Sequence, residues 1–233
     1  MIETSRREAP LPKAIIFDLD GTLVESTIDF MKFRRRLLDY VKEKGADMSM
    51  YSIKDTTVAM ISRFEQEMRR NRKDERTIDS LLSDIESFLD EIELENIERT
   101  EPVVGAIDLL EDLKNQGVKI GVLTRGSPEY ARKALDIAGL ERFVDATIGR
   151  DRKSGIRPKP HPESAFALTE KLGVPIEETI MVGDYSIDFY CARDSNIRFY
   201  GIASEPESRE SLSEAGCTEI LSDLYELRKR IGL

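Results

Sequence analysis

Cysteine is scarce in this chain, which has only Cys191 and Cys217 among its 233 residues. Cys191 falls in a predicted helix, so a framework of disulfides is not expected and a reducing compartment fits the composition. No apolar run approaches the length of a membrane span, and the N-terminus lacks the apolar segment of a signal peptide. We therefore expect a soluble, cytoplasmic protein with no membrane partner.

Positive charge is also in short supply, because 35 lysines and arginines face 45 aspartates and glutamates, a formal net charge of −10. Such a surface repels nucleic acid, so no nucleic-acid partner is expected. An anionic small substrate would need a cation or local basic side chains to be admitted. Histidine occurs once, as His161. It lies between two prolines, and we interpret it as a surface loop residue rather than a catalytic base.

Hydrophobic residues are plentiful, at 40% of the chain, so a sizeable core is available. Short apolar runs bounded by turn residues predict buried strands, and patterns of helical period lie between most of them. The predicted strands cover residues 13–18, 119–123, 144–148, 179–182 and 197–202. This alternation predicts an α/β fold with a Rossmann-like, doubly wound parallel sheet.

Residues 26–100 interrupt the alternation, because three successive segments there repeat apolar residues at helical spacing and no strand is indicated. Ser26 and Thr27 are suitable N-cap residues for the first of these helices. Three amphipathic helices can form a small bundle with its own core. We therefore divide the chain into a core of residues 1–25 and 101–233, and an inserted all-helical cap of residues 26–100.

Carboxylates follow the first predicted strand directly, at Asp18 and Asp20, and a glycine and a threonine come next. Ligands of open α/β sheets bind at the carboxyl ends of the strands. Two carboxylates spaced i, i+2 on an extended chain point to one side and can share a hard divalent cation such as Mg²⁺. Polar residues occupy matching positions beyond later strands or beside the same edge, namely Thr124, Lys159, Asp184 and Asp188.

Four motifs in order resemble those of the haloacid dehalogenase-like (HAD) superfamily, in its phosphoglycolate phosphatase-like branch with a helical cap inserted after the first motif. They are F-D-L-D-G-T-L, G-V-L-T-R, Lys159 within R-P-K-P, and V-G-D-Y-S-I-D. The resemblance covers the whole core, whereas the inserted helices match in position and class only. It implies a phosphatase that forms an aspartyl-phosphate intermediate.

The resemblance gives each first-motif aspartate a role. Asp18 would be the nucleophile that attacks phosphorus, held ionised by Mg²⁺ and a lysine ammonium. Asp20 would protonate the leaving oxygen and then activate water, and its backbone carbonyl would also bind the metal. Asp184 would complete the carboxylates around Mg²⁺, and Asp188 would bind the metal through water or orient Lys159.

The substrate phosphate would be held by the second and third motifs. Thr124 would offer its hydroxyl and backbone N–H to the phosphate oxygens, and Lys159 would neutralise charge on the transferred phosphoryl group. Arg125 departs from the family pattern, because many relatives have asparagine there. Its guanidinium could recognise a second anionic group of the substrate or point outward.

The expected function is Mg²⁺-dependent hydrolysis of a small phosphorylated metabolite by a monomer or homodimer. Alternatives of the same fold are a phosphomutase, which would return the phosphoryl group to substrate, and a phosphonate hydrolase. The latter would need an imine-forming lysine in the cap, and none there has a distinctive sequence context. A non-catalytic binding module should lack at least one catalytic residue, whereas Asp18, Asp20, Thr124, Lys159 and Asp184 are all present.

Overall fold

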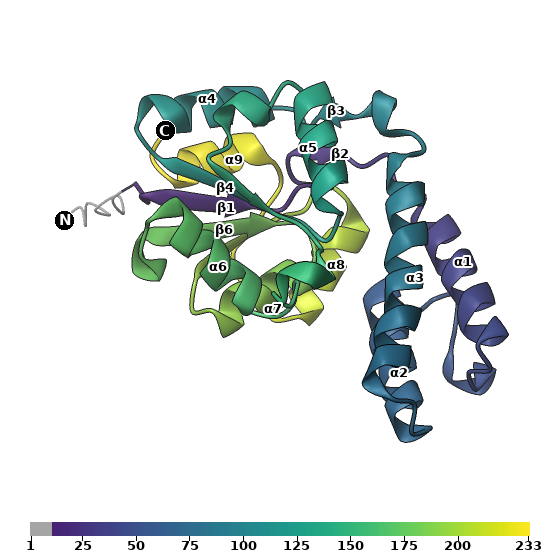
Figure 1. The fold of residues 1–233 in the computed structure, drawn as a ribbon. Helices are drawn as coiled ribbons and strands as arrows, with labels where there is room; N and C mark the ends of the chain where they lie inside the picture. The colour runs from purple at the N-terminus through teal and green to yellow at the C-terminus, as the bar shows by residue number, and fades with distance from the viewer. Residues whose placement is uncertain (1–10) are drawn as a thin grey trace. The chain divides into compact units, whose positions relative to one another are not determined.

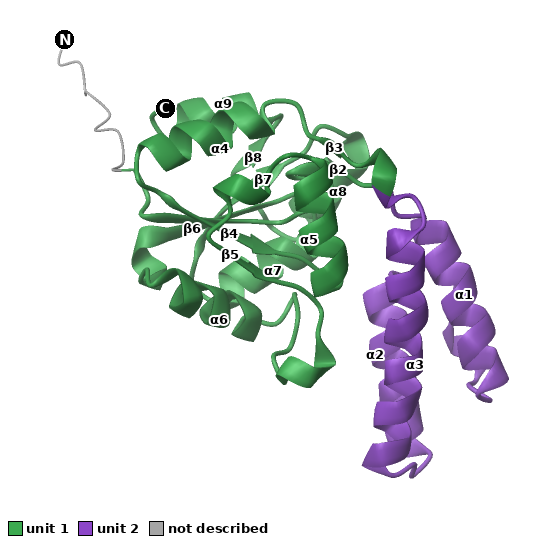
Figure 2. Cartoon of the chain, turned by 45° about the horizontal axis from the view of Figure 1, so that its top comes forward, with its two compact units in different colours: residues 1–26, 98–233 green, residues 27–97 purple. Residues whose placement is uncertain are grey.

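The structure is a computed structural model that describes residues 11–233. These residues form two compact units, shown in different colours in Figure 2. Unit 1 contains the chain up to Ser26 together with Glu98–Leu233, and unit 2 contains Thr27–Ile97. Each unit has its own core.

Unit 1 is built on a six-stranded sheet in the order β5-β4-β1-β6-β7-β8, with every neighbouring pair parallel (Figure 1). The strands are β1 (Ala14–Phe17), β4 (Lys119–Leu123), β5 (Ala146–Ile148), β6 (Thr179–Gly183), β7 (Arg198–Ile202) and β8 (Ile220–Leu221). The predicted α/β, Rossmann-like class is confirmed.

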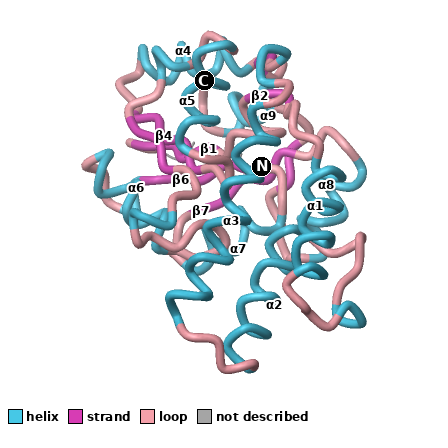
Figure 3. The backbone as a smooth tube through the Cα atoms, turned by 45° about the vertical axis from the view of Figure 1, so that its right-hand side comes forward, coloured by secondary structure: helices cyan, strands magenta, loops and turns pink. Residues whose placement is uncertain are grey.

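Helices cover both faces of this sheet, and Figure 1 shows α4 and α9 on one face with α6 and α7 on the other. The helices of unit 1 are α4 (Ala106–Asn115), α5 (Pro128–Ile137), α6 (Glu163–Leu172), α7 (Ser186–Asp194), α8 (Pro206–Glu214) and α9 (Leu224–Arg230). In Figure 3 the strands β4, β1, β6 and β7 lie together between helices. The sheet is therefore buried on both faces, which explains why its strands are continuous apolar runs.

Strand β1 lies at the centre of the core, and all four of its residues are fully buried. Ala14 and Ile16 belong to the apolar cluster that includes Leu168 of α6 and Cys191 of α7. Because successive side chains of a strand alternate between its two faces, the remaining β1 residues serve the opposite face of the sheet. The apolar run that predicted this strand thus anchors both layers.

The order of the strands fixes where a ligand should bind. The chain moves from β1 outward to β4 and β5, and then returns past β1 to β6 before continuing outward to β7 and β8. The direction of winding therefore reverses between the adjacent strands β1 and β6. Crevices at such a reversal, at the carboxyl ends of the strands, are the usual ligand sites of open α/β sheets.

Unit 2 contains three α-helices and no strand within its residues, all of which the structure describes: α1 (Phe30–Glu43), α2 (Thr57–Arg70) and α3 (Glu75–Leu94). Their apolar faces form a separate buried cluster that includes Leu37, Phe64 and Leu82. The N-cap of α1 is Asp29, whose carboxylate accepts from the Lys32 N–H at 2.8 Å. The expectation that Ser26 or Thr27 caps this helix is therefore wrong.

Among the α-helices and strands of residues 11–233, four short elements were not predicted. Helix α8 buries only Leu212, so it has no apolar period in the sequence. Strand β8 has two residues, and so do β2 (Val24–Glu25) and β3 (Glu101–Pro102), which pair antiparallel in a second sheet. These lengths are too short for a periodicity argument.

Among residues 11–233 no helix has both the length and the apolar character that a bilayer crossing requires.

Candidate active site

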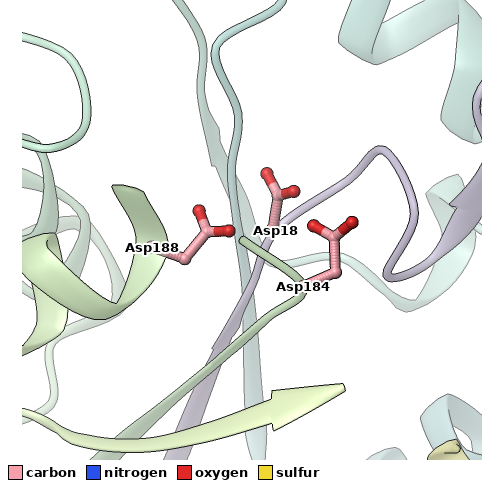
Figure 4. A group of neighbouring side chains, drawn as sticks. All are labelled: Asp18, Asp184 and Asp188. Atoms are coloured by element: carbon pink, nitrogen blue, oxygen red, sulfur yellow. The ribbon is translucent and has the colours of Figure 1, made fainter. Parts of the chain in front are cut away.

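Three carboxylates gather at the reversal point between β1 and β6 (Figure 4). Asp18 directly follows β1, Asp184 directly follows β6, and Asp188 lies in the first turn of α7. One oxygen of each carboxylate lies within 4.8 Å of the others. Two strand ends and one helix start therefore bring together aspartates that are far apart in the sequence.

Backbone pairing and two glycines allow this close approach. The Asp18 N–H donates to the Val182 carbonyl at 2.8 Å, which extends the β1–β6 pairing into the site. A Cβ atom at Gly183 would lie 2.6 Å from Cγ of Asp188, and one at Gly21 would lie 2.4 Å from Oδ2 of Asp184. Gly21 also has φ +78°, a conformation that other residues rarely adopt. Side chains at these two positions would displace the carboxylates.

Lys159 joins two of the three carboxylates. Its ammonium, 1% exposed, donates to Oδ1 of Asp18 and, at 2.6 Å, to Oδ1 of Asp188. The other oxygen of Asp188 accepts from the Tyr185 N–H at 3.1 Å, at the start of α7. Of the two roles considered for Asp188, the orientation of Lys159 is the one that these contacts favour.

The site carries more negative charge than Lys159 balances. Burial raises the pKa of Asp184 well above its usual range, and the neighbouring carboxylates Asp18 and Asp188 raise it further. Burial likewise raises the pKa of Asp18, against the opposing effect of Lys159, and raises that of Asp188 to about 6. Burial alone would lower the pKa of Lys159, but its attraction to the two aspartates outweighs this and raises it. The lysine is therefore fully charged.

These residues fit a hard divalent cation. Three carboxylates and one ammonium leave an excess of negative charge in a poorly hydrated site, and carboxylate oxygens are the ligands that Mg²⁺ prefers. Asp18 and Asp184 are the carboxylates best placed to hold it, because both Asp188 oxygens are engaged by Lys159 and Tyr185. A bound cation would lower the pKa of each carboxyl group by favouring its charged form.

Asp20 occupies a separate position beside this group, and its carboxylate is not among the three that converge. Its Oδ1 accepts a hydrogen bond from the Ser26 hydroxyl at 2.8 Å and another from the Tyr130 hydroxyl at 2.5 Å. Its negative charge nevertheless raises the pKa of Asp18, after the larger effects of burial and Lys159. The two first-motif aspartates thus have different partners and can perform different tasks.

Thr124, at the carboxyl end of β4, is 2% exposed. Its backbone N–H donates to the Ile148 carbonyl at 3.0 Å, so the expectation that this N–H serves the phosphate is wrong. Its hydroxyl oxygen accepts from the Gly126 N–H at 2.9 Å, which leaves the hydroxyl proton for an acceptor.

Arg125 does not point away from the site. Its guanidinium donates to the backbone carbonyl of Lys159, and the guanidinium of Arg150 donates to the Arg125 carbonyl at 2.8 Å. The Arg125 side chain therefore joins the second and third motifs, and the Arg150 side chain holds the backbone of the second. His161 is exposed, as expected.

Sequence reasoning missed Tyr130 and Arg150. Tyr130 is separated from Asp20 by 110 positions, and Arg150 follows a short edge strand, so neither belongs to a recognisable motif. The one available signal was the Ser127-Pro128 helix start, which places Tyr130 in the first turn of a helix that begins at the sheet's carboxyl edge. A polar aromatic residue at that position is a candidate neighbour of the site.

Comparisons with known proteins agree with this geometry. The sequence pattern of haloacid dehalogenase-like hydrolases matches residues 15–202. The phosphoglycolate phosphatase of Rhodospirillum rubrum is 26% identical over 226 residues, which cover 95% of this chain and 92% of that protein. The pyrophosphatase PpaX of Oceanobacillus iheyensis is 25% identical over 226 residues, covering 94% and 97%.

Solved structures show the same fold. The β-phosphoglucomutase of Clostridium difficile superposes with a TM-score of 0.65 at 17% sequence identity, over 95% of this chain and 97% of that one. The two relatives compared by sequence are phosphatases, and the matched pattern spans the central strands and every site residue. The chain is an enzyme that belongs to the haloacid dehalogenase-like hydrolase family.

Proposed function

We propose that this enzyme is a Mg²⁺-dependent phosphomonoester hydrolase that acts on a small phosphorylated metabolite through an aspartyl-phosphate at Asp18. The observation that carries the proposal is the contact of the buried Lys159 ammonium with Asp18, beside Asp184 and Asp188. One cationic side chain and a site for one metal ion match the charge of a phosphoryl group. A non-catalytic binding module should lack at least one catalytic residue, and none is missing here.

In the first step, an oxygen of Asp18 attacks phosphorus, and the bond between phosphorus and the leaving oxygen breaks. Asp20 gives its proton to that oxygen, so an alcohol leaves and an acyl phosphate remains on Asp18. In the second step, Asp20 accepts a proton from water as that water attacks phosphorus, and the bond between phosphorus and the Asp18 oxygen breaks. The products are inorganic phosphate and a free Asp18 carboxylate.

Lys159 offsets negative charge on the nucleophile and on the transferred group, and Asp188 holds the ammonium in place. The Thr124 hydroxyl donates to a phosphate oxygen. Mg²⁺, held by Asp18, Asp184 and the Asp20 carbonyl, would supply further neutralisation of the phosphoryl charge. Arg125 fixes the loop that carries Lys159, a role supported by its contact with the Lys159 carbonyl.

The substrate class follows from the relatives, among which are a phosphoglycolate phosphatase and a pyrophosphatase. We assign selection among small phosphorylated metabolites to the inserted helical residues, as a cap. Support comes from their position in the sequence, directly after the first motif, and from their independent core. The cytoplasmic location and the monomeric or homodimeric state stay predictions.

The test is phosphate release from a panel that includes phosphoglycolate, pyrophosphate and p-nitrophenyl phosphate, with Mg²⁺ and with EDTA. We expect Mg²⁺-dependent release from one or a few compounds, and its loss in Asp18→Asn. Asp145→Asn is the matched control, because Asp145 also pairs with lysines but directly precedes β5, where it accepts from the Ile120 N–H near the amino end of β4. Turnover that survives in Asp18→Asn would refute the nucleophile assignment.

The same panel separates the alternatives. A phosphomutase would form the aspartyl-phosphate but convert a sugar phosphate to its isomer without net phosphate release. A phosphonate hydrolase would release phosphate only from compounds with a carbon–phosphorus bond, and borohydride would trap its imine.

To test the cap, residues 28–98 can be replaced by a short linker, and we expect a broader substrate range. Unchanged selectivity would argue against the cap.

A further inference from the structure

Tyr130 lies within hydrogen-bond distance of the acid–base residue of the proposed reaction. The residue belongs to α5, is completely buried, and donates its hydroxyl to Oδ1 of Asp20 at 2.5 Å. It lies outside all four motifs that carry the family resemblance. The contact joins the first turn of α5 to the loop after β1 within unit 1.

The local backbone holds this phenol in a fixed place. Ser127 caps α5 by accepting from the Tyr130 N–H at 3.2 Å, and Pro128 occupies the first helical position. A Cβ atom at Gly126 would lie 2.5 Å from Cδ1 of the Tyr130 ring, so the ring occupies space that only a glycine leaves open. The helix start thus aims the hydroxyl at Asp20 with little rotational freedom.

Two hydroxyl donors meet the same oxygen of Asp20, since Ser26 also donates to Oδ1, at 2.8 Å. A carboxyl oxygen that accepts two hydrogen bonds uses both of its lone pairs and cannot carry the acid proton as well. When Asp20 is protonated, the proton therefore resides on Oδ2. We propose that Tyr130 is a positioning residue that fixes the Asp20 carboxyl so that Oδ2 gives and receives the proton.

This inference rests on the proposed function, and the dependence on the leaving group tests it. Departure of an alcohol from an alkyl phosphate needs a proton from Asp20, whereas p-nitrophenolate leaves without one. The ratio kcat/KM reports events up to the first irreversible step, which is expulsion of the leaving group. A misoriented Asp20 should therefore slow that step for alkyl phosphates alone.

The experiment compares kcat/KM of Tyr130→Phe and the unaltered enzyme for p-nitrophenyl phosphate and for the best alkyl phosphate of the panel. We expect a loss of about 10- to 100-fold with the alkyl phosphate, part of the usual contribution of general acid catalysis. With p-nitrophenyl phosphate the change should stay within about threefold, because no proton is needed. Phenylalanine fills the same ring space, and melting curves would verify the fold.

Tyr200→Phe is the matched control, since Tyr200 is a buried tyrosine of β7 in unit 1 that no step of the proposed reaction uses. That variant should retain both activities. Equal losses on both substrates in Tyr130→Phe, or no loss on either, would overturn the positioning role. Asp20→Asn tests the underlying function in the same assay: a loss that is independent of the leaving group would overturn the acid role of Asp20 and that of Tyr130 with it.

Discussion

At the scale of single residues, the candidate site contains more buried negative charge than positive charge. Asp18, Asp184 and Asp188 lie in a poorly hydrated site with one ammonium among them, and all three have a raised pKa because burial penalises their charged forms. Such a group binds protons more tightly in the folded protein than in the unfolded chain. Its contribution to stability is therefore complete at low pH and is lost as pH rises through the folded pKa.

Because the folded protein loses stability when Asp184 ionises, Asp184→Asn should stabilise the metal-free enzyme. The same change should abolish turnover. At pH 7.5 in EDTA we expect the variant to melt at least about 2–4 °C higher, the shift that about 1 kcal/mol produces in a chain of this size. The difference should vanish near pH 4, because the pKa of Asp184 in the folded protein lies well above its usual range and the carboxyl is then protonated. Melting curves over this pH range measure it.

Mg²⁺ supplies the complementary measurement. It should raise the melting temperature of the unaltered enzyme and leave that of Asp184→Asn nearly unchanged, because binding to the folded state alone stabilises it. If Asp184→Asn is less stable than the unaltered enzyme at pH 7.5 without metal, the buried negative charge does not destabilise the site as argued.

Arg125 gives a second prediction at this scale. Because its guanidinium donates to the Lys159 carbonyl, Arg125→Ala should loosen the loop that carries the lysine. We expect kcat/KM to fall by about 10-fold or more for every substrate of the panel, since misplacement of a catalytic group by an ångström is costly. A loss confined to phosphoglycolate, with its second anionic group, would instead show that Arg125 binds substrate.

At the scale of elements, the site depends on how closely β6 and α7 approach each other. Gly183 in β6 and Gly201 in β7 are partners in the sheet register, and a Cβ atom at either would meet a side chain 2.6 Å away. At Gly183 that side chain is the Asp188 carboxyl, and at Gly201 it is Leu212 of α8. The same substitution therefore has different consequences on neighbouring strands.

Gly183→Ala should reduce kcat by about 10-fold or more, as expected when a group that positions the catalytic lysine is displaced. Gly201→Ala should cost about 1–3 kcal/mol of stability by overpacking the core, while turnover per folded molecule is retained. Denaturant titration together with steady-state kinetics separates the two effects. Equal turnover in the two variants would show that Asp188 does not need its present position.

Elements were also the level at which the sequence was most informative. The buried strands β1, β4 and β6 are nearly continuous apolar runs that end at polar residues, so their positions and the site residues that follow them could be predicted. Strand β8 and helix α8 bury too little apolar surface to leave a period. The Tyr130–Asp20 contact depends on how α5 packs beside the first loop, which no spacing along the chain reveals.

At the scale of the whole molecule, the net charge of −10 opposes the arrival of an anionic substrate. We expect kcat/KM for phosphoglycolate to rise about twofold or more between about 0.01 and 0.1 M ionic strength, as the screening length shortens from about 30 to 10 Å. The rise should be smaller for p-nitrophenyl phosphate, which carries one charge fewer. Kinetics at constant free Mg²⁺ would measure both, and a decrease with salt would show that local positive charge dominates.

The short antiparallel pair of β2 and β3 has a consequence for the history of such enzymes. Val24 pairs with Pro102 and Glu25 with Glu101, so the chain leaves unit 1 and re-enters it at neighbouring points. In this two-stranded sheet, the residues of unit 2 take the place of the short loop that joins the strands of an ordinary hairpin. Loop-closure entropy grows only slowly with length, so a long insertion costs the core little stability once its ends are paired. A core of this kind can therefore exchange its inserted helices for another module while its own strands and helices fold unchanged.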